Sequence, residues 1–262
     1  MNSEKISDAI NEVGDKYYEE AVVYHGKKRT WVKWAGIAAC LAVAVFAALP
    51  NLSPSKPANI HLGMDKVYIN ELETSSGDGS RTGYDEDLYD CVTWDKKAIA
   101  KHFGRDLTPA YIPDGLTAGK NNGTASVYVE KGGKLVDDTV WLEYYHGYYP
   151  DGSPKLTDNT AAQKGFTIEA SKLGIVDDCY IVMPQDAKAT DINGTKVIFG
   201  HFSVPYGPYD DNDEPAGYYD MYVVKFKLDG VEYRITAEQL SEYEVVKTVS
   251  SIIYGQEISV DK

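Results

Sequence analysis

The residue types that carry most enzyme chemistry are present in this chain, but their spacing matches no known catalytic or metal motif. The histidines are His25, His61, His102, His146 and His201, and no two of them lie two to four residues apart. The chain has no H-E-x-x-H, G-x-S-x-G, Walker or G-x-G-x-x-G motif. We therefore predict no catalytic residue, no metal ligand, no cofactor and no enzymatic activity. A carboxylate pair for glycoside hydrolysis stays open, because only the fold assembles such a pair.

One acidic run, at residues 210–214, has the oxygen ligands that calcium prefers. It lacks the glycine and the distal glutamate of an EF-hand loop. We interpret it as a solvated acidic loop.

Tyrosine is unusually frequent, with 21 Tyr against 6 Phe. Exposed tyrosine rings stack on sugar faces or anchor protein interfaces. The alternative is that these rings are ordinary strand residues, alternating between the core and an edge. The candidate ligand-binding residues are the clustered Tyr144, Tyr145, Tyr148, Tyr149, Tyr206 and Tyr209.

The three cysteines are too few for a disulfide-rich scaffold or a cysteine-rich zinc module. Cys91 and Cys179 both fall in the long C-terminal part and form a candidate disulfide. Two separate buried thiols are the alternative, because sequence spacing says nothing about the distance between them.

Charge and hydropathy divide the chain near its start. The net charge of −14 disfavours nucleic acid as a partner, because phosphate binding needs clustered Lys and Arg. Residues 1–33 carry six acids and six bases, so the whole excess of negative charge follows residue 50. Between these parts, residues 34–49 form an uncharged apolar run of roughly 24 Å as a helix. That length approaches the roughly 30 Å hydrocarbon core of a bilayer.

We interpret this run as a single transmembrane helix over residues 31–52. Trp31, Lys33 and Trp34 stand at its edge, where aromatic and basic residues favour the membrane interface. The basic residues before it place the N-terminus in the cytoplasm and the C-terminal part outside the cell. A cleaved signal peptide is the alternative, although the charged segment before the run is long for one.

An amphipathic helix is predicted within the cytoplasmic segment, residues 1–30. Its apolar face includes Ile6, Ile10, Val13 and Tyr17, which recur at spacings of three and four. Because an isolated helix of this length is marginal in water, the face needs a partner. That partner is either the inner membrane surface or a groove on a cytoplasmic protein.

The remaining chain divides into a polar linker, residues 53–59, and an extracellular domain, residues 60–262. We expect a first strand at 66–70, a helix at 94–102 capped by Thr93, and a hairpin of 125–131 with 139–146. Further strands are expected at 165–171, 178–183 and 196–204, the last two joined through the turn at Asn193-Gly194. A second hairpin pairs 221–228 with 231–235 across Asp229-Gly230.

Two overlapping capping boxes, Thr236 to Gln239 and Ser241 to Glu244, start a C-terminal helix with an apolar stripe. The predicted fold class is α+β: an antiparallel sheet with this helix packed on one face, preceded by the single transmembrane helix.

Several segments resemble single-pass, anti-sigma-factor-like membrane proteins of Gram-positive bacteria. They are the stub at 6–10, the junction at 27–41 and the Tyr-Ile-Pro-Asp-Gly-Leu segment at 111–116. The stretch 233–253 is similar to the end of an uncharacterised extracellular domain often attached to such anchors. The resemblance implies a membrane-tethered signalling regulator whose inner segment binds a sigma factor or another cytoplasmic protein.

Together these features predict a single-pass protein of the cell membrane whose extracellular domain senses or binds a ligand. Its expected partners are the lipid bilayer, a cytoplasmic protein and wall glycan, but not nucleic acid. The alternative function is a cell-surface module that binds glycan or wall without a signalling role.

Overall fold

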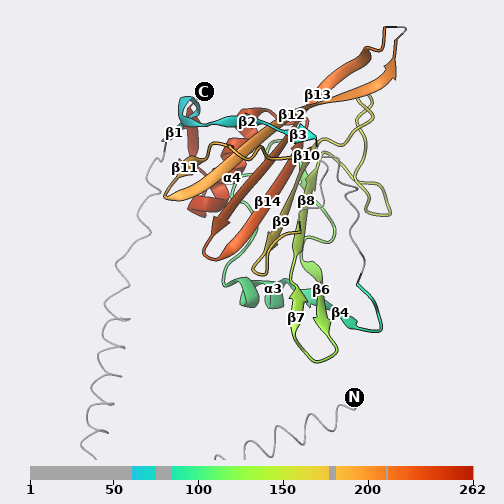
Figure 1. The fold of residues 1–262 in the computed structure, drawn as a ribbon, viewed down its shortest axis with the longest axis vertical. Coiled ribbons are helices and arrows are strands. Elements are labelled where there is room, and N and C mark those ends of the chain that lie inside the picture. Colours follow the sequence, from blue (N-terminus) through green and yellow to red (C-terminus); the bar gives the residue numbers. More distant parts are fainter. Residues whose placement is uncertain (1–60, 75–83, 177–180, 211, 262) are drawn as a thin grey trace, which may run out of the picture. The chain divides into compact units, whose positions relative to one another are not determined.

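An eight-stranded sheet forms the centre of the computed structural model (Figure 1). The structure describes residues 61–74, 84–176, 181–210 and 212–261, and all of them belong to one compact unit, Pro57–Lys262. The strands of the first half are β1 (His61–Gly63), β2 (Ile69–Glu71), β3 (Glu73–Thr74), β4 (Tyr89–Asp95), β5 (Thr117–Ala118), β6 (Thr124–Glu130), β7 (Leu135–Asp137) and β8 (Val140–Tyr145). The later strands are β9 (Gly165–Ser171), β10 (Ile181–Val182), β11 (Thr190–Ile192), β12 (Thr195–Tyr209), β13 (Pro215–Leu228), β14 (Val231–Glu238) and β15 (Ser259–Asp261). The helices are the short 3-10 helix η1 (Met64–Lys66) and the α-helices α3 (Lys96–Phe103) and α4 (Glu242–Tyr254).

The central sheet has the order β11-β12-β13-β14-β9-β8-β5, and β2 adds to β12 in parallel. A separate sheet of three strands, β4-β6-β7, lies beside it. Two short pairs, β1 with β15 and β3 with β10, complete the pairing of the named strands.

The predicted α+β fold class is wrong. Strands account for 47% of the described residues and helices for only 13%, and the strands form several sheets instead of one. The error arose because β3, β5, β7, β10, β11 and β15 are two or three residues long, too short for alternation to reveal them. The N-terminal transmembrane helix in that prediction lies outside the described residues. No helix within 61–74, 84–176, 181–210 and 212–261 has the length and apolar character to span a membrane.

The Asp-Gly turn between β13 and β14 is confirmed. Both turn residues have positive φ, 51° at Asp229 and 81° at Gly230, and Leu228 pairs with Val231. This geometry matches the right-handed twist of the flanking strands and favours Asp-Gly. Asn193-Gly194 forms a similar turn, but it joins β11 to β12, and the described part of the expected 178–183 strand instead pairs as β10 with β3.

The expected hairpin of residues 125–131 and 139–146 does not form. β6 pairs with β7 and β4, whereas β8 pairs with β9 and β5 in the central sheet. The three residues of β7 were missed, and they take the place beside β6 that the prediction gave to β8. The chain therefore leaves one sheet at β7 and enters the other at β8.

Both helices begin at a side-chain cap. Asp95, and not the predicted Thr93, caps α3 by accepting a hydrogen bond from the Ala98 amide, because β4 stays paired with β6 as far as Asp95. At α4, the capping box of Ser241 and Glu244 is confirmed. The predicted box that starts at Thr236 does not form, since Thr236 belongs to β14.

Helix α4 lies over one face of the central sheet (Figure 1). Its buried apolar side chains share a core with the alternate inward residues of the strands, as expected for a helix packed on a sheet. The helix contributes Val245, Val246, Val249, Ile252 and Ile253 to this core.

Asp138 lies at the switch point, where the chain passes from β7 of the three-stranded sheet to β8 of the central sheet, and its side chain is fully buried. Its carboxylate accepts hydrogen bonds from the Ser171 hydroxyl and from the backbone amides of Lys172 (3.0 Å) and Leu173 (3.3 Å). It also contacts His102 Nε2 on α3 at 2.8 Å. Burial raises the pKa of the Asp138 carboxyl, but the hydrogen bonds from Ser171, His102 and the amides outweigh burial and hold its pKa below the ordinary value.

A buried charge pair crosses two neighbouring strands of the central sheet. Glu169 on β9 and Arg234 on β14 face each other in register and form two parallel hydrogen bonds of 2.6 and 2.7 Å. Arg234 Nη1 also donates to the Val176 carbonyl at 3.3 Å. Such bidentate geometry offsets the desolvation of two buried charges.

We predict that Asp138→Asn lowers the free energy of unfolding by about 3 kcal/mol, because the amide NH₂ places a donor against groups that themselves donate. Since the folded pKa of Asp138 lies below the unfolded value of about 3.9, its stabilisation is present above roughly pH 4 and is lost as the pH falls through the folded pKa. Urea unfolding at neutral and acidic pH measures both effects, and the difference between the variant and the parent should shrink in acid. The exposed Asp114→Asn is the matched control, and equal stability of Asp138→Asn and the parent at neutral pH would refute the assignment.

We predict that Arg234→Met lowers the free energy of unfolding by about 3–5 kcal/mol, because it leaves the Glu169 carboxylate buried without the Arg234 guanidinium. The double variant Glu169→Leu with Arg234→Met should recover most of this loss, since it removes both charges from the interior. Urea unfolding of the single and double variants tests the pair. A double variant no more stable than Arg234→Met would contradict the prediction.

Candidate functional site

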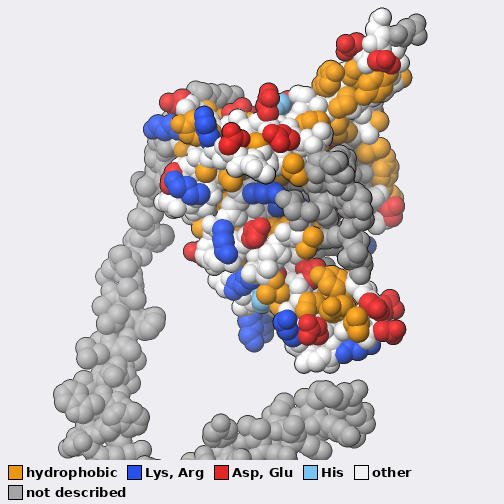
Figure 2. Space-filling view, in the orientation of Figure 1, with side chains coloured by type: hydrophobic (Ala, Val, Ile, Leu, Met, Phe, Trp, Pro, Cys, Tyr) orange, Lys and Arg blue, Asp and Glu red, His pale blue; other side chains and the backbone are white. Residues whose placement is uncertain are grey.

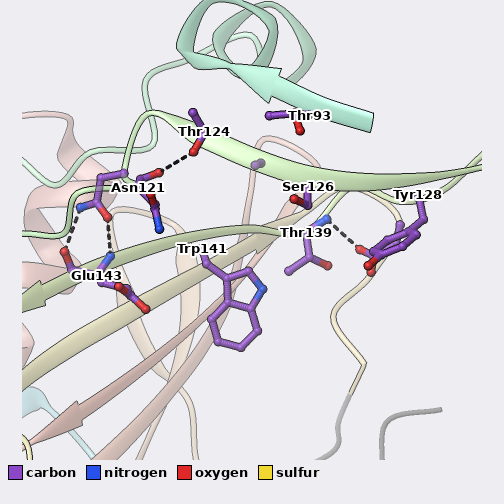
Figure 3. A pocket seen from close by; sticks show the side chains of 11 residues that line it. Thr93, Asn121, Thr124, Ser126, Tyr128, Thr139, Trp141 and Glu143 are labelled. Atoms are coloured by element: carbon purple, nitrogen blue, oxygen red, sulfur yellow. Dashed lines mark hydrogen bonds between the residues drawn. The ribbon is translucent and has the colours of Figure 1, made fainter. Parts of the chain in front are cut away.

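A cavity of about 350 Å³ lies between the three-stranded sheet and β8 of the central sheet (Figure 3). Most of its lining residues are polar, and they combine hydroxyls, side-chain amides and carboxylates with two aromatic rings. The lining residues are Thr93, Asn121, Asn122, Thr124, Ala125, Ser126, Tyr128, Asp137, Thr139, Trp141 and Glu143.

Strand alternation explains one wall of this cavity. In β6, Ala125 and Val127 are buried in the core, so the alternating residues Thr124, Ser126 and Tyr128 take the opposite face. Apart from the Tyr128 ring and Ala125, which also lines the cavity, this wall is therefore polar.

The same alternation in β8 places Trp141 on the opposite wall. Its neighbours Val140 and Leu142 are buried, whereas the Trp141 side chain is 40% exposed. Glu143, two residues further along, shares its face, and Figure 3 shows both side chains extending from β8. A large aromatic ring and a carboxylate thus lie side by side at the cavity.

The side chain of Asn122 forms two hydrogen bonds with the backbone of Glu143 on β8. Its Nδ2 donates to the Glu143 carbonyl at 2.8 Å, and its Oδ1 accepts from the Glu143 amide at 2.8 Å. The loop before β6 is thereby fixed to β8, which gives the cavity a defined shape before any ligand binds.

Asp137 lines the cavity, and its carboxylate is held by two hydrogen bonds. Its Oδ1 accepts from the Thr139 amide at 2.8 Å and its Oδ2 from the Tyr84 hydroxyl at 3.2 Å. The Tyr84 ring stacks on Tyr128 with centroids 4.1 Å apart. The Asp137 carboxylate and the Tyr128 ring therefore hold fixed positions.

These groups suit a polyhydroxylated ligand. The exposed face of an indole ring packs against the C–H face of a pyranose, while hydroxyls, amides and carboxylates bind its hydroxyl groups. Ligand sites of this kind combine aromatic surface with a few polar groups in fixed orientation.

The tyrosines singled out in the sequence do not line this cavity. Tyr144 is 2% exposed and stacks on Phe166, and Tyr145 is 7% exposed. Both are corrections to the predicted surface site, because β8 packs them into the molecule. Tyr148 is half-buried and Tyr149 is exposed, in the chain that follows β8.

Tyr206 and Tyr209 lie at the end of β12, in the long β12–β13 hairpin. This hairpin projects from the rest of the domain, and Figure 2 shows hydrophobic side chains along it. Tyr209 is 58% exposed, whereas Tyr206 is half-buried.

The remaining predicted site residues fall partly outside the described part of the chain. The partner-binding face (Ile6, Ile10, Val13, Tyr17) and the membrane-interface residues (Trp31, Lys33, Trp34) lie outside it. So does Cys179, while Cys91 is exposed on β4. The disulfide, the cytoplasmic partner and the membrane contact stay predictions.

The buried Ser171 and Asp138 lie close to the half-buried His102, but the three do not form a nucleophilic triad. The Ser171 hydroxyl donates to Asp138, and Asp138 contacts His102, so the aspartate stands between the other two. A nucleophilic serine must instead donate to the histidine that takes its proton. Within the described residues, no group of three or more His, Cys, Asp or Glu side chains is arranged to hold a metal ion.

Sequence reasoning missed Trp141 and Asn122. The signal for Trp141 was the run Val140-Trp141-Leu142-Glu143, in which a tryptophan occupies an outward position between two inward residues. No comparable signal marks Asn122, whose partner is a backbone unit 21 residues away.

Comparison of this chain with known proteins finds no relative. No protein-family model, curated protein or solved structure matches this chain. The resemblance to anti-sigma-factor-like membrane proteins therefore stays a prediction.

We predict that Asn122→Ala lowers the free energy of unfolding by about 1–3 kcal/mol, because two hydrogen bonds to the Glu143 backbone are lost. Thermal or urea unfolding measures the effect. Asn121→Ala, the adjacent exposed amide, is the matched control and should leave stability nearly unchanged. Equal losses in the two variants would contradict the role given to Asn122.

Proposed function

We propose that this chain is a membrane-anchored envelope protein whose folded domain binds a glycan in the cavity beside Trp141. The observation that carries the proposal is the pairing of an exposed indole with side-chain amides, hydroxyls and carboxylates around one cavity. Sugar recognition needs this combination, because a pyranose has both an apolar C–H face and a rim of hydroxyl groups.

The rigidity of the cavity supports the same function. Its walls are strands of two sheets, joined by the Asn122 contacts, and the lining carboxylate of Asp137 is held by hydrogen bonds. Because the polar groups are already oriented, a ligand loses less free energy in ordering them.

Membrane anchoring is supported by the sequence. Residues 34–49 form an uncharged apolar run with basic residues before it, and the acidic excess follows residue 50. An anchor of this kind would hold the folded domain at the outer surface, where wall glycan is present.

We predict that the full-length chain in detergent micelles binds at least one member of a panel of neutral and amino-sugar oligosaccharides, measured by calorimetry. Trp141→Ala should weaken this binding about tenfold or more, because the apolar contact of the indole is lost. Trp141→Phe should retain part of the affinity, since a smaller aromatic face remains.

Tyr218→Ala is the control for a general loss of exposed aromatic surface, since Tyr218 is 58% exposed on β13 and does not line the cavity. Its affinity for the same oligosaccharide should equal that of the parent. Absence of binding across the panel, or unchanged binding by Trp141→Ala, would overturn the proposed function.

A further inference from the structure

The charged residues that line the cavity beside Trp141 are all acidic. Its lining includes two carboxylates, Asp137 and Glu143, and none of its lining residues is Lys, Arg or His. The domain around it carries the acidic excess of the chain, so the surrounding field has the same sign. A ligand with a positive charge is favoured there, and one with a carboxylate or phosphate is repelled.

Glu143 is the carboxylate available to such a ligand. Within the described residues, no hydrogen bond or ion pair holds its side chain, whereas the Asp137 oxygens already accept from Thr139 and Tyr84. Gly119 leaves room for the Glu143 side chain, because a Cβ at that position would lie 3.1 Å from Glu143 Oε2.

The negative charge of Glu143 acts on the hydroxyl of Tyr148. Burial, and after it the negative charge of Glu143, raises the pKa of Tyr148 to about 12. No basic residue of the cavity lining compensates that charge.

We propose that the glycan bound beside Trp141 is an amino sugar with a free ammonium group, and that Glu143 pairs with this ammonium. The inference rests on the proposed function and specifies its ligand class. The indole packs on the C–H face of the ring, and the carboxylate on the same face of β8 accepts charge-assisted hydrogen bonds from the ammonium. An acetylated amino group lacks the charge, so its binding would desolvate Glu143 without compensation.

The test compares three probes with the full-length chain in detergent micelles: a tetramer of β-1,4-linked glucosamine, its fully N-acetylated counterpart, and tetralysine. The measurement is calorimetry at about pH 6, where carboxylates are ionised, in about 0.15 M salt to screen the net charge. The glucosamine tetramer should bind about tenfold tighter than the acetylated tetramer. Tetralysine, which has the charge without the pyranose rings, should bind weakly.

Glu143→Gln should reduce the preference for glucosamine to within about twofold. The glucosamine tetramer loses its charged partner, and the acetylated tetramer no longer has to desolvate a carboxylate. Glu71→Gln is the matched control. It also removes one negative charge, but Glu71 is exposed on β2, at the far side of the central sheet from β8. Its preference should equal that of the parent, and circular dichroism confirms the fold of each variant.

The outcomes separate the two proposals. If neither tetramer nor any other oligosaccharide binds, the proposed function fails and the inference fails with it. If both tetramers bind equally, glycan binding stands and the amino-sugar inference is overturned. Tetralysine binding as tight as glucosamine, or an unchanged preference in Glu143→Gln, also overturns the inference.

Discussion

The arrangement of the two sheets depends on the hydrogen bonds that the buried carboxylate of Asp138 accepts. It lies between β7, the last strand of the small sheet, and β8, an inner strand of the central sheet. Its hydrogen bonds join this switch point to the end of β9 and to helix α3. A buried carboxylate without these partners would be strongly destabilising, so the partners must assemble together with the switch. The cavity is a consequence, because its two walls are β6 on one side of the switch and β8 on the other.

Local signals in the sequence predicted the parts of the fold that local interactions decide. The Asp229-Gly230 turn and the Ser241–Glu244 capping box depend on residues within a few positions of one another. Strand partners were not predictable in the same way. The pairing of β6 with β7 instead of β8 depends on a three-residue strand and on a carboxylate whose partners lie more than 30 residues away. The fold class was missed for this reason, since short strands in separate sheets leave little periodicity to detect.

The candidate site was harder to predict than the fold, because composition does not say which face of a strand a residue occupies. The Tyr144-Tyr145 pair drew attention through its density, yet both rings are buried. The single Trp141, three residues earlier in the same strand, faces the cavity. Asn122 contributes through hydrogen bonds to a distant backbone unit, and only the folded chain brings that unit within reach.

A cavity formed by a few strand residues gives limited affinity for one sugar unit, because its contact area is small and ligand ordering opposes binding. A polymeric glycan changes this balance. Copies of the protein held at one membrane surface would meet many equivalent units on a single polymer, and each further contact becomes effectively intramolecular. Modest affinity at each site then suffices for firm attachment to the polymer. Under the proposed function the anchor and the cavity would act together: the anchor would supply the local concentration, and the carboxylate beside Trp141 would supply the discrimination between sugars.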